Sequence, residues 1–179
     1  MSALRQVVIH CTEVPTLEES RVFAERILYP SGTGACGHFY LDRDGTAVQF
    51  VPLARMAHHV ASFNRRSIGI ELVNSGRYPH WYDASRQEMT EPYSEAQYEA
   101  LEELLSWLAV TALGRGLVLV GHEDLDGRFL PAEKGSGLVR RKVDPGPLFD
   151  WSRLSGSSLW RIERRDRTLL RGTSLIQKR

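Results

Sequence analysis

The sequence predicts a single α/β domain, because short apolar runs typical of buried strands share the chain with amphipathic helices. The chain has 179 residues, a length that suits one domain with its own hydrophobic core. Its apolar content of 42% and charged content of 25% are ordinary for a globular protein. We interpret residues 1–151 as the globular domain and residues 152–179 as a basic C-terminal extension that is not a separate domain.

The expected strands are short runs rich in β-branched and aromatic residues. Runs of this kind, bounded by turn residues, are typical of strands buried in a sheet. Between two of them, Asp44-Gly45 is a strong signal for a hairpin turn. The expected strands span residues 7–10, 38–41, 46–51, 67–73 and 117–121.

Two segments have the apolar periodicity of helices. Residues 17–28 follow Thr16, a candidate N-cap. The clearest helix follows Ser94, which with Gln97 has the pattern of a capping box, and ends near Gly114. The two apolar stripes consist of Val22, Phe23, Ile27 and Leu28, and of Tyr98, Leu101, Leu104, Leu105 and Leu108. Residues 123–141 read as a long polar loop, and so do residues 74–92, a kind of segment that in compact domains tends to be functional.

Charge, hydropathy and cysteine content exclude several classes of partner and of structure. A formal net charge of +1 gives no argument for nucleic acid or an anionic membrane as the main partner. We find no apolar run near the roughly 20 residues that span a bilayer, and no signal-peptide pattern. We therefore expect synthesis in the cytoplasm, with any release to the cell wall by lysis or a non-Sec route. Two cysteines are too few for a disulfide framework; we read Cys11 as a small buried residue and leave Cys36 open.

Two histidines and a carboxylate form a candidate metal site. His10 and His122 each end an apolar strand, where an open sheet places ligands, and Asp144 follows the loop after the second strand. Two histidines, one carboxylate and a water are a known arrangement of catalytic zinc. A lone histidine at a strand end is more often a hydrogen-bonded polar residue than a metal ligand. The prediction of a metal site therefore depends on the three residues together.

Glu71 and Lys142 could complete such a site. Glu71 interrupts a buried apolar strand, where a carboxylate is costly unless it is paired or used. Lys142 lies two residues before Asp144, so in an extended segment both side chains face one side, and the prolines of Pro145-Gly146-Pro147 stiffen this segment. An attacking water needs a base, and the developing oxyanion needs a cation. The structural alternatives are an ion pair of Glu71 with Arg65, Arg66 or Lys142, and a solvated surface Lys142.

Seven motifs and Asn64 together make the chain resemble a known family. They are VVIHCT (7–12), HFYLDRDG (38–45), AHH (57–59), SIGIEL (67–72), YSEAQY (93–98), VGHED (120–124) and RKVDPGP (141–147). In this order they are similar to the zinc-dependent N-acetylmuramoyl-L-alanine amidases of the type-2 amidase and peptidoglycan-recognition superfamily. The resemblance covers residues 5 to 151, most of the chain.

The resemblance implies a mixed central sheet flanked by helices and one Zn²⁺ bound by His10, His122 and Asp144. It further implies that Glu71 acts as base and Lys142 stabilises the oxyanion. The bond cut would be the amide between N-acetylmuramic acid and L-alanine, so the implied partner is peptidoglycan or a muropeptide. The implied substrate-binding residues, in the groove or just behind it, are His38, His59, Asn64 and Phe39.

Three departures from the family pattern bear on the substrate. Phe39 stands where many members carry a tyrosine, and neighbouring Tyr40 would point to the opposite face of a regular strand. His58 replaces a common tryptophan beside His59. The loop between His122 and Asp144 is longer than in compact recycling enzymes and resembles phage lysis amidases, which favours polymeric peptidoglycan over small anhydro-muropeptides.

Two other functions compete with the amidase. One is a non-catalytic module that binds muropeptide in the same groove, and the other is a zinc hydrolase of another peptidoglycan amide. Inactive members of the superfamily typically lack a zinc ligand, whereas this chain keeps all three. The extension carries Arg161, Arg164, Arg165, Arg167 and Arg171. It is either a functional tail, drawn to anionic cell wall or membrane or used for docking, or an ordinary terminal extension that is packed on the domain or frayed.

Overall fold

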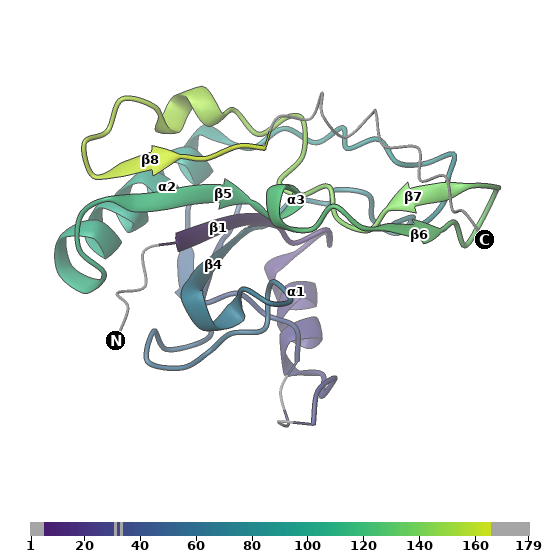
Figure 1. The fold of residues 1–179 in the computed structure, drawn as a ribbon, viewed down its shortest axis with the longest axis horizontal. Coiled ribbons are helices and arrows are strands. Elements are labelled where there is room, and N and C mark those ends of the chain that lie inside the picture. The colour runs from purple at the N-terminus through teal and green to yellow at the C-terminus, as the bar shows by residue number, and fades with distance from the viewer. Residues whose placement is uncertain (1–5, 31, 33, 166–179) are drawn as a thin grey trace, which may run out of the picture.

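A six-stranded mixed sheet forms the centre of the protein (Figure 1). The structure is a computed structural model that describes residues 6–30, 32 and 34–165. The strand order is β3-β2-β4-β1-β5-β8; β3 runs antiparallel to β2, and every other neighbouring pair is parallel. The strands are β1 (Gln6–Cys11), β2 (Phe39–Leu41), β3 (Ala47–Gln49), β4 (Ser67–Leu72), β5 (Leu117–Gly121) and β8 (Trp160–Ile162). The mixed α/β fold implied by the resemblance is confirmed.

The longest helix, α2 (Glu95–Trp107), covers one face of this sheet. Its capping box is confirmed, because Ser94 Oγ accepts from Gln97 N at 3.1 Å and Gln97 Oε1 accepts from Ser94 N at 3.1 Å. A π-helical turn, η2 (Leu108–Ala112), continues it. The remaining helical elements are α1 (Leu17–Glu25), α3 (His122–Leu125) and the 3-10 turns η1 (Asn64–Arg66) and η3 (Trp151–Leu154).

Alternation along the strands divides the sheet into two chemically different faces. Successive side chains of a strand point to opposite faces. In β1, Val7 and Ile9 join the core under α2, whereas Val8 and His10 lie on the other face. The core under α2 also contains Leu41, Ile68, Ile70, Leu72, Leu101, Leu105, Leu117 and Leu119, all buried. The opposite face carries a smaller apolar cluster around Val8, Val60 and Val120, and beside it the polar side chains of the candidate site.

Helix α1 differs from the sequence prediction in length and in burial. It ends at Glu25 rather than residue 28, and within this fully described helix Ser20 is the buried residue. The expected apolar stripe faces outward: Val22 is 60% exposed and Ile27 is 71% exposed. Amphipathic periodicity identifies a helix but does not show which face meets the core. Within this stripe Phe23 lines a cavity, where it meets Trp81 edge-to-face at 6.4 Å.

Two segments read from the sequence as irregular contain secondary structure. Residues 123–141 hold most of α3 and a separate hairpin of β6 (Phe129–Pro131) and β7 (Leu138–Arg140). In the extension, β8 pairs with β5 as the edge of the central sheet, and Arg164 forms ion pairs with Glu123 and Asp124 of α3. The described part of the extension therefore packs on the domain; residues 166–179, with Arg167 and Arg171, lie outside the described residues. Among the described helices none is long and apolar enough to cross a membrane.

Candidate metal centre

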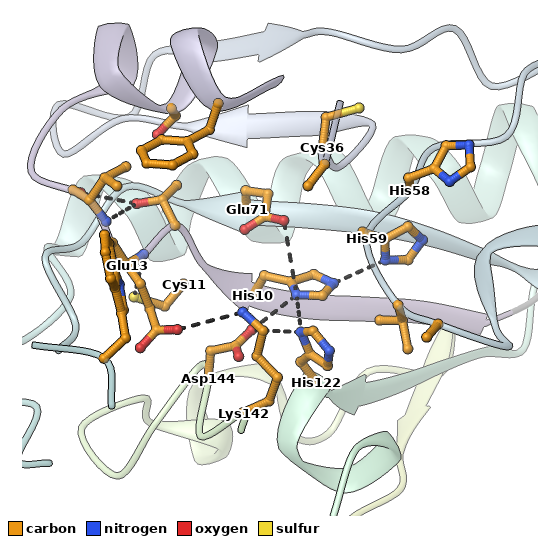
Figure 2. A pocket seen from close by; sticks show the side chains of 18 of the residues that line it. His10, Cys11, Glu13, Cys36, His58, His59, Glu71, His122, Lys142 and Asp144 are labelled. Carbon is orange, nitrogen blue, oxygen red and sulfur yellow. Dashed lines mark hydrogen bonds and ion pairs between the residues drawn. The ribbon is translucent and has the colours of Figure 1, made fainter. Parts of the chain in front are cut away.

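Three residues that lie side by side on neighbouring strands form the base of the candidate site. Parallel pairing places Glu71 of β4 between His10 of β1 and Tyr40 of β2, and all three point away from the α2 core. His122 is the first residue of α3 directly after β5, so it reaches the same end of the sheet as His10. Asp144 arrives on the segment that follows β7. Figure 2 shows the side chains converging from these elements.

The three expected metal ligands come together. His10 Nδ1 and Asp144 Oδ2 are 3.0 Å apart, the two histidine Nδ1 atoms are 3.0 Å apart, and His122 Nδ1 lies 3.1 Å from Asp144 Oδ2. All three residues are buried. Among the described residues, this is the cluster of ligating side chains that could hold a metal ion.

The chemistry of this cluster fits a metal ion. Burial lowers the pKa of His10 to about 4, so its imidazole is neutral at pH 7 and can offer a lone pair. Although burial opposes its ionisation, His122 and Lys142 hold the pKa of Asp144 well below its usual value. Neutral imidazole and ionised carboxylate are the forms that bind zinc. In addition, Asp144 Oδ1 and His122 Nε2 are buried and lack a hydrogen-bond partner among the described residues. A tetrahedral ion with bonds of about 2.0–2.1 Å requires ligand atoms about 3.3 Å apart, close to the observed triangle.

A chain of hydrogen bonds fixes which nitrogen of His10 faces the triangle. Ser67 Oγ donates its proton to Phe63 O at 2.8 Å, so it accepts from His59 Nε2 at 3.3 Å. His59 Nδ1 is then an acceptor for His10 Nε2 at 3.0 Å. His10 Nδ1 consequently carries the lone pair that points toward Asp144 and His122. Partners of this kind orient the ligating histidines of metal sites.

The ring of His59 has no spare room. A Cβ atom at Gly69 would lie 2.6 Å from His59 Cγ, whereas one at Gly127 would meet no atom within 4 Å. We expect Gly69→Ala to lower the free energy of unfolding by about 1–3 kcal/mol through overpacking, and Gly127→Ala to leave it nearly unchanged. Urea unfolding of the two variants measures this difference. Equal stability would show that His59 can move at no cost.

Glu71 and Lys142 also reach the site. Glu71 Oε1 lies 3.9 Å from His10 Nδ1. Burial, and after it the charge of Asp144, raises the pKa of Glu71 well above its usual value, which makes the carboxylate a stronger base. No ion pair among the described residues joins Glu71 to Arg65 or Arg66, and Lys142, 26% exposed, is not a fully solvated lysine. A pairing of Glu71 with Arg65 or Arg66 and a fully solvated Lys142 therefore do not describe these side chains, whereas the charges of Glu71 and Lys142 do act on each other in the cavity.

The expected substrate-binding residues fall into two groups. His59 and Asn64 line the cavity, and Asn64 Oδ1 also accepts from the backbone N of His59 at 3.0 Å. His38 is not among the lining residues, because it is buried behind His59, where it accepts from Gly69 N at 3.1 Å and hydrogen-bonds Arg55 O at 3.1 Å. From this position His38 can support the ring of His59 but does not face a substrate in the cavity.

The expectation for Phe39 requires correction. Its ring is buried in the core under α2, edge-to-face with Trp107 at 6.3 Å, on the far side of the sheet from the cavity. The regular alternation of β2 instead turns Tyr40 to the cavity, beside Glu71. Tyr40 Oη accepts from Gly37 N at 3.2 Å, and burial raises the pKa of this phenol well above its usual value.

The site is the floor of one cavity of about 410 Å³. Its rim is aromatic: Tyr29 and His58 stack at 4.6 Å, and Phe23, Trp81 and Tyr82 line the wall beside α1. Sequence reasoning identified most of the floor and, at the rim, His58, but not the other rim rings, because these come from segments with no common motif. It also missed Glu13 and Arg77, a buried ion pair described below.

A family match over residues 1–147, together with the fold, places the chain in the type-2 amidase and peptidoglycan-recognition superfamily. The fold matches Escherichia coli AmiD solved with the substrate anhydro-N-acetylmuramic acid-L-Ala-D-gamma-Glu-L-Lys, with a TM-score of 0.61, 23% identity and coverage of 85% of this chain and 56% of that chain. It also matches human PGRP-IBETAC in complex with glycosamyl muramyl pentapeptide, with a TM-score of 0.60, 16% identity and coverage of 90% and 87%.

The chain belongs to the Amidase_2 family, described as N-acetylmuramoyl-L-alanine amidase, which matches residues 1–147. One relative is the 1,6-anhydro-N-acetylmuramyl-L-alanine amidase AmpD of Enterobacter cloacae, 34% identical over 119 residues. That alignment covers 62% of this chain and 50% of the relative, so the chain spans about half the length of the relative it matches.

Proposed function

We propose that this protein is a Zn²⁺-dependent hydrolase that cleaves the amide between N-acetylmuramic acid and L-alanine in peptidoglycan or muropeptides. The triangle of His10, His122 and Asp144 in a cavity that also holds Glu71 and Lys142 is the observation that carries the proposal. Membership of the Amidase_2 family supports it, and so do the relatives named for the same bond.

Each side chain then has a task at the scissile amide. His10, His122 and Asp144 would hold the zinc, which would supply Lewis acidity at the scissile carbonyl. Glu71 accepts a proton from the attacking water and returns it to the departing amine of L-alanine, while the carbonyl carbon gains the water oxygen and loses the nitrogen. The ammonium of Lys142 stabilises the negative charge that develops on the carbonyl oxygen. The lone pair of His10 is kept in place through His59.

Product analysis tests the proposal against its two rivals. We expect digestion to release stem peptides that begin with a free L-alanine amine, together with glycan that keeps its lactyl carboxylate. Mass spectrometry of the products, after digestion of both polymeric peptidoglycan and a small anhydro-muropeptide, provides the measurement. Zinc-loaded protein that binds muropeptide without releasing any peptide would support a recognition module instead. Fragments cut within the stem would support a hydrolase of another amide.

The two substrates in the same assay separate a polymer hydrolase from a recycling enzyme. The long segment between His122 and Asp144, which contains the β6–β7 hairpin, favours the polymer. The named activity of the AmpD relative favours the anhydro-muropeptide. The ratio of kcat/KM for the two substrates shows whether polymeric peptidoglycan or the small anhydro-muropeptide is preferred.

A further inference from the structure

A buried ion pair lies beside Lys142 and outside the metal triangle. We propose that Glu13 and Arg77 are positioning residues, which hold the Lys142 ammonium over the reacting carbonyl and hold in place the segment that carries Lys142 and Asp144. This role rests on the proposed function, because Lys142 needs positioning only if it acts on a substrate.

Arg77 connects a long loop to the segment that enters the site. Its guanidinium binds Glu13 through two bonds, Nε to Oε1 at 2.7 Å and Nη2 to Oε2 at 3.1 Å. The same group donates to the backbone carbonyls of Arg140 at 2.9 Å and Arg141 at 3.2 Å. The side chain of Arg77 is only 1% exposed. A planar guanidinium with five donors can make these bonds together, which a lysine ammonium cannot. Arg77 thereby holds the chain immediately before Lys142.

Glu13 reaches Lys142 directly. Its Oε2, the atom that Arg77 Nη2 contacts, lies 3.6 Å from Lys142 Nζ, a contact drawn as a dashed line in Figure 2. A lysine has a long, flexible side chain, so a second carboxylate restricts where its charge rests. Glu13 is 5% exposed and lines the same cavity as Glu71.

The backbone at Glu13 is unusual and well held. Glu13 has φ of 52°, a left-handed conformation that is uncommon outside glycine. Trp81 Nε1 donates to its carbonyl at 3.0 Å, and the neighbouring Gly76 leaves no room for a side chain, since a Cβ there would lie 2.8 Å from Glu13 Cγ. Strained residues that their surroundings fix in this way cluster at functional sites. Here the conformation turns the carboxylate from the end of β1 back toward Lys142.

Two substitutions separate the parts of this arrangement. Glu13→Gln keeps an acceptor for Arg77 but removes the negative charge facing Lys142; we expect kcat to fall by about 10- to 100-fold with KM and zinc content little changed. Arg77→Lys keeps a buried cation but loses the bonds to the backbone carbonyls before Lys142; we expect zinc affinity, measured by competition with a chelating dye, to fall by about tenfold as well. Glu91→Gln is the matched control, because Glu91 also binds an arginine, Arg43, and the same loop at Ser75 N, but does not line the cavity.

A double-mutant cycle with Lys142→Ala tests whether Glu13 acts through Lys142. If it does, Glu13→Gln has no further effect on kcat in the Lys142→Ala background; losses that multiply would indicate a general structural role and overturn the proposal. Thermal unfolding midpoints check that each variant is folded. An active unmodified protein whose Glu13→Gln variant keeps its kcat overturns the positioning role alone. An unmodified protein that releases no stem peptide from either substrate overturns the proposed function, and the positioning role with it.

Discussion

Glu71→Ala is expected to slow amide hydrolysis by about 10²- to 10⁴-fold while the protein keeps its zinc, because a general base typically contributes that much. Glu71 lies beside the ligand triangle, with Oε1 3.9 Å from His10 Nδ1, without belonging to the cluster of His10, His122 and Asp144. Steady-state rates on a muropeptide, paired with metal analysis of the same samples, measure both effects. A variant that turns over at the native rate would show that another group accepts the proton.

A second substitution at this position, Glu71→Gln, is expected to stabilise the zinc-free fold. Burial raises the pKa of Glu71, so in the zinc-free protein the folded state holds a proton that the unfolded state releases above its ordinary pKa. That difference costs stability, and the cost grows as the pH rises above about 4.5. Zinc-free Glu71→Gln should therefore gain stability over the unmodified protein as the pH rises from 4.5 to 7. A Glu71→Gln variant that loses stability relative to the unmodified protein over that pH range would contradict a protonated Glu71 in the zinc-free folded state.

Asp144→Ala is expected to abolish both zinc binding and turnover. The carboxylate of Asp144 supplies one of three ligand atoms, and its loss also removes one of the buried carboxylates that act on Lys142. Metal content after dialysis, and activity before and after added zinc, are the measurements. Asp83→Ala is the matched control, because Asp83 is a loop aspartate that hydrogen-bonds Ser85 in an exposed turn. A zinc-replete Asp144→Ala protein would require a different set of ligands.

Local patterns predicted the elements that hold the site. Apolar runs ending in His10 and His122 correctly indicated strand ends, and the Ser94–Gln97 pattern correctly indicated the start of α2. The interruption of an apolar strand by Glu71 was informative because burial of a carboxylate is costly. These signals lie within a few neighbouring residues, so the sequence alone carries them.

Features that depend on long-range packing were beyond such patterns. The face that Phe39 occupies follows from the register of β2 against β4, which a strand of three residues does not reveal by itself. The outward face of α1 depends on which elements pack against that helix, and its own periodicity does not specify them. The Glu13–Arg77 pair joins residues 64 positions apart and needs a left-handed backbone at Glu13, for which neither composition nor spacing gives a signal.

Strand β8 has a consequence for how this protein can be shortened. The family match ends at residue 147, yet the central sheet continues through β8, which covers the outer side of β5. A chain cut after residue 151 would leave backbone groups of Leu117–Leu119 in β5 without their β8 partners, and an exposed apolar edge strand can recruit other chains. A C-terminal fusion partner or purification tag therefore belongs after residue 165. A product that ends where the family match ends would lack β8 and would expose the edge of β5.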